Sequence, residues 1–482
     1  MEAFVNALNS VIWSPALIYL CLGAGLYFSI RTRFMQVRGF GEMIRLIFRG
    51  QSSAAGVSSF QALAISLSGR VGTGNIAGVA TAIAFGGPGA VFWMWVVAFL
   101  GASTAYVEST LAQIYKEKDD SGQYRGGPAY YIEKAMGQKW YAWLFAVVTI
   151  IATGLLLPGV QANSIAAGLQ NAWDIPTWMT ASVVVVALGF IIFGGVKRIA
   201  HFAQVVVPFM ALAYILIALG VLAMNVDRVP EMFALIFNSA FGWQAGFGAV
   251  LGLAIEWGVK RGIYSNEAGQ GTGPHAAAAA EVTHPAKQGY VQAFSVYIDT
   301  LLVCSATAFL ILSTGMYNVT GPDGAMLVNG LPGVEAGPGF TQAAIESVLP
   351  GFGAPFVALA LLFFAFTTIV AYYYMAETNI AYINRKVHRP WLTLALRVGI
   401  MAAVAYGAIK SASLAWGLGD IGVGLMAWLN LIAILILQRP ALLALRDYEA
   451  QKKAGKDPVF DPDALGIRNA ELWREKLERR DG

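Results

Sequence analysis

One apolar stretch of this sequence is interrupted by a run of small and polar residues, Gly72-Thr73-Gly74-Asn75. At membrane depth, nonhelical backbone is tolerated only where it is buried in protein or lines a cavity. The carbonyl groups that unwinding frees can coordinate a cation, and the N–H groups where the helix resumes suit a carboxylate. Asn75 adds a side-chain oxygen. We therefore predict that Gly72, Thr73, Gly74 and Asn75 bind a zwitterionic small molecule and a cation.

Side chains in other apolar stretches could complete such a site. Gln161, which follows Pro158, could face the interrupted run or bond to a neighbouring helix. Trp257 could wall a pocket or simply pack. Thr367 and Thr368 are adjacent hydroxyls, which can bond back to carbonyls of their own helix or hold a hard cation as oxygen donors. The residues alone leave these alternatives open.

A carboxylate within an apolar stretch is costly to place in a membrane, so each one is a candidate functional residue. Asp299 could serve ion binding or partner Arg70. Glu256 could receive a substrate ammonium group, or pair with Lys260 one helical turn further on. Glu108 lies toward one end of its stretch, where it could snorkel or pair with a basic residue.

The composition indicates that lipid is the main solvent of this chain. Of its 482 residues 57% are apolar and only 12% are charged, about half the charged fraction of a soluble protein. Cys21 and Cys304 lie inside apolar runs, and the four histidines have no metal-ligand spacing. We therefore expect no cofactor other than a coupling ion, no nucleic-acid partner, and a lipid bilayer around the protein.

Apolar runs of about 20 residues predict membrane-spanning helices. The N-terminal residues 1–10 hold no Lys or Arg, so the first run lacks the basic region of a signal peptide and should stay in the membrane. Residues 438–482 are polar and predict a soluble tail. The eleven predicted helices are 11–30, 58–85, 89–115, 141–170, 178–196, 201–224, 236–265, 288–316, 351–384, 391–410 and 412–437.

Lys and Arg gather on alternate connections, as the positive-inside rule describes. The connections 86–88, 171–177 and 317–340 hold neither residue, and only Arg228 and Lys410 fall on that side. This asymmetry predicts a multi-pass membrane protein with its N-terminus outside and its tail in the cytoplasm. The basic residues lie at 31–49, 116–139, 197–198, 260–261 and 385–389.

Ten of the eleven helices divide into two sets of five, which predicts an inverted repeat. The N-terminal helix and a basic segment occupy 1–57, the two halves 58–230 and 231–437, and the tail 438–482. The first helix of each half should be discontinuous. The helix 58–85 is interrupted by the polar run, and the helix 236–265 by glycines, although small residues also simply allow close packing. These glycines are Gly242, Gly246, Gly248 and Gly252.

Three motifs resemble the alanine or glycine:cation symporter family, and the resemblance covers residues 11–437. It implies a LeuT-type architecture for this all-α polytopic membrane protein, coupling to Na⁺ or H⁺, and small neutral amino acids as substrates. The motifs are 72–80 (Gly-Thr-Gly-Asn-Ile-Ala-Gly-Val-Ala), 86–95 (Gly-Gly-Pro-Gly-Ala-Val-Phe-Trp-Met-Trp, with Gly101) and 261–269 (Arg-Gly-Ile-Tyr-Ser-Asn-Glu-Ala-Gly).

The likeness to LeuT-type sodium symporters also implies a set of sodium ligands. The carbonyls of Ser68 and Val71 would face one Na⁺, and the hydroxyls of Thr367 and Thr368 would complete its shell. Tyr372 stands where the family pattern has Trp. This smaller aromatic leaves more room, which puts strict selectivity for alanine and glycine in doubt.

The resulting hypothesis is a sodium-coupled symporter that imports alanine or glycine by alternating access. Proton coupling and a larger substrate such as glutamine remain alternatives. A channel would need charge rings or filter loops, and an enzyme would need a nucleophile–base or metal set. The sequence contains neither, and no phosphate-binding loop either, so we predict a protein that is not an enzyme.

Overall fold

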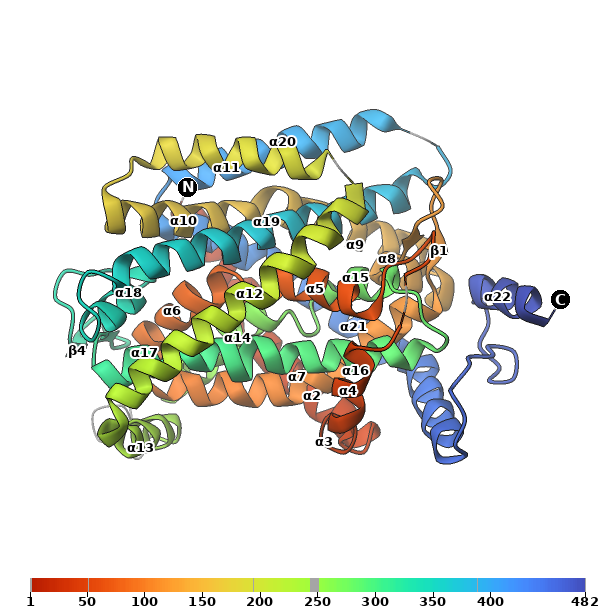
Figure 1. Ribbon diagram of the computed structural model, residues 1–482, viewed down its shortest axis with the longest axis horizontal. Helices are drawn as coiled ribbons and strands as arrows, with labels where there is room; N and C mark the ends of the chain where they lie inside the picture. Colours follow the sequence, from red (N-terminus) through yellow and green to blue (C-terminus); the bar gives the residue numbers. More distant parts are fainter. Residues whose placement is uncertain (1, 51, 194, 243–250, 388, 482) are drawn as a thin grey trace.

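The computed structural model describes residues 2–481 apart from 51, 194, 243–250 and 388, and these form a bundle built almost wholly of helices (Figure 1). The long helices lie side by side along the longest axis of the molecule. Figure 1 shows strands β1 and β4 at opposite ends of the bundle. The antiparallel pairs are β1 (Glu117–Lys118) with β2 (Tyr124–Arg125), and β3 (Asn318–Thr320) with β4 (Met326–Asn329).

The N-terminal part forms one bent helix and two short ones. Helices α1 (Glu2–Ile12) and α2 (Pro15–Arg31) meet at an angle of 43°, because Pro15 cannot continue the α1 hydrogen bonds but suits the first turn of α2. The indole of Trp13 at the bend donates to the carbonyl oxygen of Asp420 over 2.9 Å. Helices α3 (Met35–Arg38) and α4 (Phe40–Ile47) follow.

The next part of the chain begins with a helix that is interrupted. The Ser58 side chain accepts from the backbone N–H of Gln61, and the Gln61 side chain accepts from that of Ser58, which fixes the start of α5. In chain order the elements are α5 (Ser59–Arg70), η1 (Gly74–Gly78), α6 (Val79–Gly86), α7 (Gly89–Ile114), α8 (Pro128–Tyr131), η2 (Ile132–Met136), α9 (Lys139–Ile151), η3 (Ala152–Leu156), α10 (Leu157–Trp173), α11 (Thr177–Ile192) and α12 (Gly195–Met224).

The remaining part packs back on these helices: α14 and α16 lie against α7, and α19 and α20 lie against α10. A left-handed glycine, Gly315, ends α17. The elements are η4 (Val226–Arg228), α13 (Val229–Ala240), α14 (Leu251–Asn266), α15 (Gly273–Ala279), α16 (Pro285–Val296), η6 (Tyr297–Cys304), α17 (Ser305–Thr314), α18 (Pro338–Glu346), α19 (Gly353–Asn384), α20 (Pro390–Ile409), α21 (Ala412–Lys453) and α22 (Glu471–Asp481).

Among the described residues, seven helices are long and apolar enough to cross a membrane, or eight if α1 and α2 form one span. The sequence predicts eleven. The other three predicted spans correspond to helices that are short or divided. The span 58–85 is split into α5, η1 and α6, the span 178–196 contains the 16-residue α11, and the span 236–265 contains parts of α13 and α14.

The outer faces of the bundle are apolar, whereas charged side chains lie inside it. Val186 on α11 and Phe209 on α12 are each 74% exposed. Arg70, Glu108 and Asp299 are buried. Soluble monomers rarely expose large continuous apolar surfaces, so this arrangement is that of a multi-pass membrane protein.

The tail predicted at 438–482 packs against the end of the bundle where β1 lies (Figure 1). Helix α21 continues to Lys453, and the chain then folds back so that the N–H of Phe460 donates to the carbonyl of Thr283 over 3.0 Å. Lys476 pairs with Glu281 in the connection before α16. Burial raises the pKa of the Glu281 carboxyl, but the bonds from Lys476 and Ser53 hold it below its ordinary value.

Helices α10 and α20 cross closely at two glycines, Gly159 and Gly407. Measuring the stability of a variant with a larger residue at the crossing tests this close contact. A Cβ added at Gly407 would overlap the backbone of Gly159. We expect Gly407→Ala to lower the stability by about 1–3 kcal/mol, as overpacking does. The matched control is Gly23→Ala on α2, because a Cβ at Gly23 meets no atom within 4 Å. Thermal midpoints in detergent check this, and equal midpoints for the two variants would contradict the close crossing.

Candidate functional site

The first helix break lies where the sequence predicts it, between α5 and η1. Val71 has φ −78° and ψ 87°, which ends the α-helix. The N–H of Gly72 donates to Oδ1 of Asn75 over 2.8 Å, and the N–H of Thr73 donates to Oε1 of Gln161 over 3.0 Å. Side-chain oxygens from Asn75 and from α10 thus satisfy two N–H groups that the break releases.

The same break frees carbonyl groups. In an uninterrupted helix the N–H of Gly72 would bond to the carbonyl of Ser68, but it is turned to Asn75 instead. The Thr368 hydroxyl replaces this N–H group as the partner of the Ser68 carbonyl. It lies 2.8 Å from the Ser68 oxygen and 3.5 Å from the Val71 oxygen. Three of the four predicted sodium ligands therefore come together.

Thr367, the fourth predicted ligand, is placed differently. Its hydroxyl donates to the carbonyl of Phe364 in its own helix over 2.9 Å. Thr368 also reaches the Phe364 carbonyl, at 3.0 Å, so its hydroxyl lies among three backbone oxygens. All of these groups are hard oxygen donors in a buried position, which is the chemistry that an alkali cation requires.

The wall of the break is formed by Gln161 and two tyrosines. The Gln161 amide nitrogen lies 3.4 Å from the Tyr264 hydroxyl, and the Tyr372 phenol faces the same amide. A Cβ added at Gly74 would lie 3.1 Å from the Tyr264 ring. Gln161 and Tyr372 thus lie at the break, as predicted. Tyr264 was missed, although it lies in the 261–269 motif.

The span 236–265 is divided at its glycines, as predicted: α13 ends at Ala240, Gly242 has a left-handed φ of 68°, and α14 begins at Leu251. The second break at the site lies further along the chain, after α14. Helix α14 runs without interruption from Leu251 to Asn266, so the prediction that Gly252 interrupts a helix is wrong. The chain leaves the helix at Glu267 (φ 58°) and passes through Gly269 (φ 89°) and Gly271 (φ 82°) before α15 begins. Left-handed residues break a helix, whereas glycines with helical angles only allow close packing. Gly242 follows α13, and Gly246 and Gly248 lie outside the described residues.

Two predicted substrate residues lie away from the first break. Trp257 contacts Phe85 at the far end of α6, with ring centroids 4.9 Å apart. Glu256 precedes Trp257 on α14. Its predicted alternative, an ion pair with Lys260, is wrong, because Lys260 binds Asp420 over 2.9 Å. Helical periodicity does not show at which depth of the bundle a side chain meets its neighbours. This is why the sequence placed these two residues at the first break.

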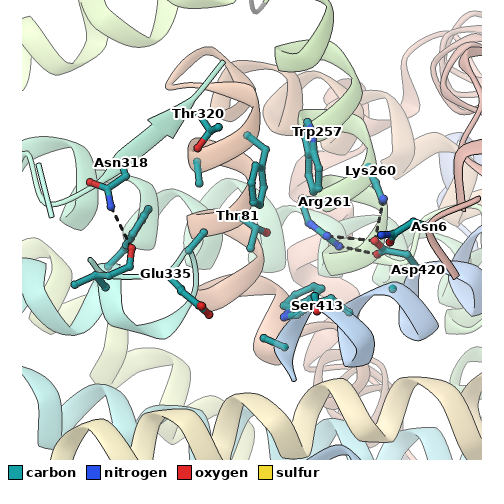
Figure 2. A pocket seen from close by; sticks show the side chains of 18 of the residues that line it. Asn6, Thr81, Trp257, Lys260, Arg261, Asn318, Thr320, Glu335, Ser413 and Asp420 are labelled. Carbon is teal, nitrogen blue, oxygen red and sulfur yellow. Dashed lines mark hydrogen bonds and ion pairs between the residues drawn. The ribbon is translucent and has the colours of Figure 1, made fainter. Parts of the chain in front are cut away.

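Trp257 instead lines a cavity of about 760 Å³ between α1, α6, α14, the start of α21, strands β3 and β4, and the segment 333–336 that follows β4. Figure 2 shows Lys260 and Arg261 pointing toward Asp420 at one side of this cavity. Arg261 pairs with Asp420 over 2.7 Å, and its guanidinium lies 4.4 Å from the centre of the Trp416 ring. A Cβ on Gly78 would lie 3.6 Å from Trp416 and 3.9 Å from Arg261. These two side chains therefore separate the cavity from η1.

The buried carboxylates take part in the two breaks. Asp299 accepts from the Asn75 amide over 2.6 Å and from the Ser265 hydroxyl over 3.1 Å. It forms no ion pair with Arg70, whose guanidinium donates to the carbonyl of Gln292 instead, over 3.1 Å. Asp299 thus connects η6 to the first break.

Glu108 serves the second break. It accepts from the N–H of Gly269 over 3.2 Å and from the Asn430 amide over 2.7 Å. Its side chain is buried, so the prediction that it snorkels or pairs with a basic residue is wrong. The position of Glu108 near the end of its helix does not reveal that a neighbouring broken helix needs a hydrogen-bond acceptor at that point.

A membrane bundle with a discontinuous helix, a buried oxygen cluster and an adjoining cavity is typical of a transport protein. Comparison with known proteins supplies the family: residues 1–462 match the sodium:alanine symporter family, and the chain belongs to it. It is a transporter and not an enzyme.

Relatives from three organisms are all named as alanine carriers or symporters. A Bacillus subtilis protein, provisionally named a sodium/proton-dependent alanine carrier, is 67% identical over 99% of this chain and 98% of its own. A protein of that name from Bacillus sp. strain PS3 is 55% identical over 91% and 98%. The sodium/alanine symporter of Methanococcus maripaludis is 37% identical over 90% and 94%.

A solved structure resembles the fold. The crystal structure of a mutant manganese transporter from Eremococcus coleocola superposes with a TM-score of 0.50 and 13% sequence identity, over 86% of this chain and 92% of that one. At this identity the likeness concerns the fold alone.

The close approach at the first break provides a test. A Cβ added at Gly72 would overlap the Thr368 hydroxyl and lie 3.0 Å from Oε1 of Gln161. We expect Gly72→Ala to lower alanine uptake at least about tenfold, which corresponds to about 1.4 kcal/mol. Gly252→Ala is the control, because its Cβ meets no described atom within 4 Å. Uptake by equal amounts of purified, reconstituted protein decides, and wild-type uptake by Gly72→Ala would place the site elsewhere.

Proposed function

We propose that this protein is a sodium-coupled symporter that imports alanine and glycine across a bacterial inner membrane by alternating access. The observation that carries the proposal is the position of the Thr368 hydroxyl, 2.8 Å from the Ser68 carbonyl and 3.5 Å from the Val71 carbonyl. These oxygens lie at the break in the α5–η1 helix, beside the N–H groups that donate to Gln161 and Asn75.

The cation is held by oxygens that are already in place. When Na⁺ enters, the Thr368 hydroxyl turns a lone pair toward it, and the Ser68 and Val71 carbonyls exchange the hydroxyl hydrogen for the ion. Sodium suits this set because it prefers neutral and anionic oxygens and needs neither thiolate nor imidazole. The ion also completes the bonding of the freed carbonyls, so its binding stabilises the broken conformation of the helix.

The amino acid binds beside the ion. The N–H groups at the start of η1 lie at the positive end of a helix dipole and suit the substrate carboxylate. Tyr264, Tyr372 and Gln161 limit the space beside Gly74, which favours a small side chain. The names of the relatives support alanine, although a 43% identical Bacillus subtilis protein is named a "probable sodium/glutamine symporter".

The proposed topology has eleven crossings: an N-terminal helix in 1–57, five helices in 58–230 and five in 231–437. The N-terminus lies outside and the tail 438–482 in the cytoplasm. Two features support this LeuT-type arrangement. One is the alternation of basic connections. The other is the pair of interrupted helices, α5–α6 and α14–α15, one near the start of each half.

Sodium coupling is sufficient to concentrate a neutral substrate. One Na⁺ that moves down 100 mV releases about 2.3 kcal/mol, and a tenfold sodium gradient adds about 1.4 kcal/mol. One-for-one coupling then sustains roughly 400- to 500-fold accumulation, at about 1.4 kcal/mol per tenfold. Uptake into proteoliposomes with an imposed sodium gradient tests the proposal. Uptake that never exceeds equilibration of the substrate would indicate a channel instead.

The sodium site predicts a difference between two adjacent threonines. Thr368→Ala removes the hydroxyl next to both freed carbonyls, a loss of about 1–3 kcal/mol for a buried polar group. We expect the sodium concentration for half-maximal uptake to rise roughly 5- to 150-fold, with partial rescue by excess Na⁺. Thr367→Ala is the matched control, because its hydroxyl bonds only within its own helix. The same sodium dependence in both variants would contradict the assignment.

The aromatic at 372 should set the size of the substrate. Tyr372 is 2% exposed and faces Gln161 at the proposed site. Tyr372→Trp fills more of this space, so we expect glycine and alanine to be favoured over glutamine. Competition of each unlabelled amino acid against labelled alanine measures the effect. An unchanged inhibition profile would remove Tyr372 from the pocket wall.

A further inference from the structure

Three carboxylates and one guanidinium form a buried charge cluster around the two helix breaks. Arg70 ends α5, Glu108 lies on α7, Asp299 lies in η6, and Glu267 is the first residue of the second break. Each is at most 1% exposed. All three carboxylates act electrostatically on Arg70. If all four groups were ionised, the cluster would carry an excess negative charge in a region of low dielectric constant.

Glu267 differs from the other two carboxylates in its bonding. Asp299 accepts from Asn75, Ser265 and Thr300, and Glu108 accepts from Gly269 and Asn430. Neither oxygen of Glu267 has a hydrogen-bond partner within the described part of the chain. The Thr272 hydroxyl lies beside the carboxylate and interacts with it, but without the geometry of a hydrogen bond. An ionised carboxylate that is buried without partners is costly.

The position of Glu267 connects both breaks. A Cβ added at Gly69 would lie 3.3 Å from each carboxylate oxygen, so the group faces the residue between Ser68 and Arg70. The Arg70 guanidinium reaches the start of α15, where a Cβ on Gly273 would lie 2.6 Å from it. Glu267 also has left-handed φ, a strained conformation for a residue other than glycine. Such strain is found at switch segments.

The surroundings suit a proton rather than a second metal cation. The methyl group of Met375 would lie 2.8 Å from the same Cβ added at Gly69, so one wall beside the carboxylate is apolar. A sodium ion would need several converging oxygens, whereas a proton needs only one carboxylate oxygen. The titratable groups that face Glu267 are Arg70, Glu108, Tyr264, Asp299 and Tyr372.

We propose that Glu267 carries a proton through the transport cycle, which rests on the symport function proposed above. The carboxylate binds one H⁺ from the outer side and becomes a neutral carboxyl group. It releases the same H⁺ to the cytoplasm when the second break opens, and Arg70 then balances the restored negative charge. Protonation weakens the attraction between Glu267 and Arg70 and so loosens the link between the two breaks.

The experiment makes two measurements on each protein in proteoliposomes with Na⁺ equal on both sides. Sodium-dependent exchange of labelled alanine is measured in vesicles preloaded with alanine, and proton entry is measured with a pH dye trapped in vesicles that contain no alanine. We expect alanine addition to acidify the interior with the wild type. Glu267→Gln should give no acidification above protein-free liposomes but keep sodium-dependent exchange. The control is Glu231→Gln, an exposed carboxylate on α13, which should acidify like the wild type.

Each other outcome overturns this assignment. Acidification by Glu267→Gln, or none by a wild type that exchanges alanine, removes the proton role and leaves sodium symport intact. Loss of exchange and acidification together in a folded Glu267→Gln shows that transport itself needs the carboxylate, and overturns the assignment of a proton-carrying role alone. A wild type without sodium-dependent exchange refutes the symport function itself. If Glu267→Gln does not fold, Glu267→Asp should shift the pH midpoint of acidification, and an unshifted midpoint counts against the proposal.

Discussion

Backbone polar groups at membrane depth must find partners inside the protein, because lipid supplies none. The break at Val71 releases a carbonyl at Ser68 and N–H groups at Gly72 and Thr73. Three side chains replace the lost helical bonds: Thr368 from α19, Asn75 from the segment itself and Gln161 from α10. The polar side chains of otherwise apolar helices therefore converge on one place, and the packing of α5, α10 and α19 depends on that convergence.

Under the proposed function, the groups that satisfy the breaks are also the groups that the ligands use. A cation among the freed carbonyls and a carboxylate at the N–H groups supply the same bonds that the side chains make in this structure. The second break follows the same rule, with Glu108 and Asn430 bonding to its backbone at Gly269. Arg261 and Trp416 lie between the first break and the adjoining cavity, so a ligand that reached the break through this cavity would have to displace these side chains.

Much of this arrangement could be predicted from sequence, and the failures have identifiable physical causes. The Gly-Thr-Gly-Asn run marked the first break, because glycines and polar residues in the middle of an apolar helix weaken it. Such a run therefore indicates a place where the helical backbone opens. Gly252 did not mark the second break, because glycine also fits a packed helix. The residue that turns the chain there is Glu267, a carboxylate in a left-handed conformation. Nothing in the local composition indicates that conformation, since the surrounding bundle imposes it.

The amino-acid sequence by itself determined that the chain lies in a membrane, where most of its helices run, and which residue types could bind a cation. These properties depend on composition and local periodicity. Only the tertiary structure decided which hydroxyl of the Thr367–Thr368 pair meets the freed carbonyls, and that Trp257 lines a separate cavity. The physical reason is that helix rotation and the depth of each side chain follow from packing between segments far apart in the sequence.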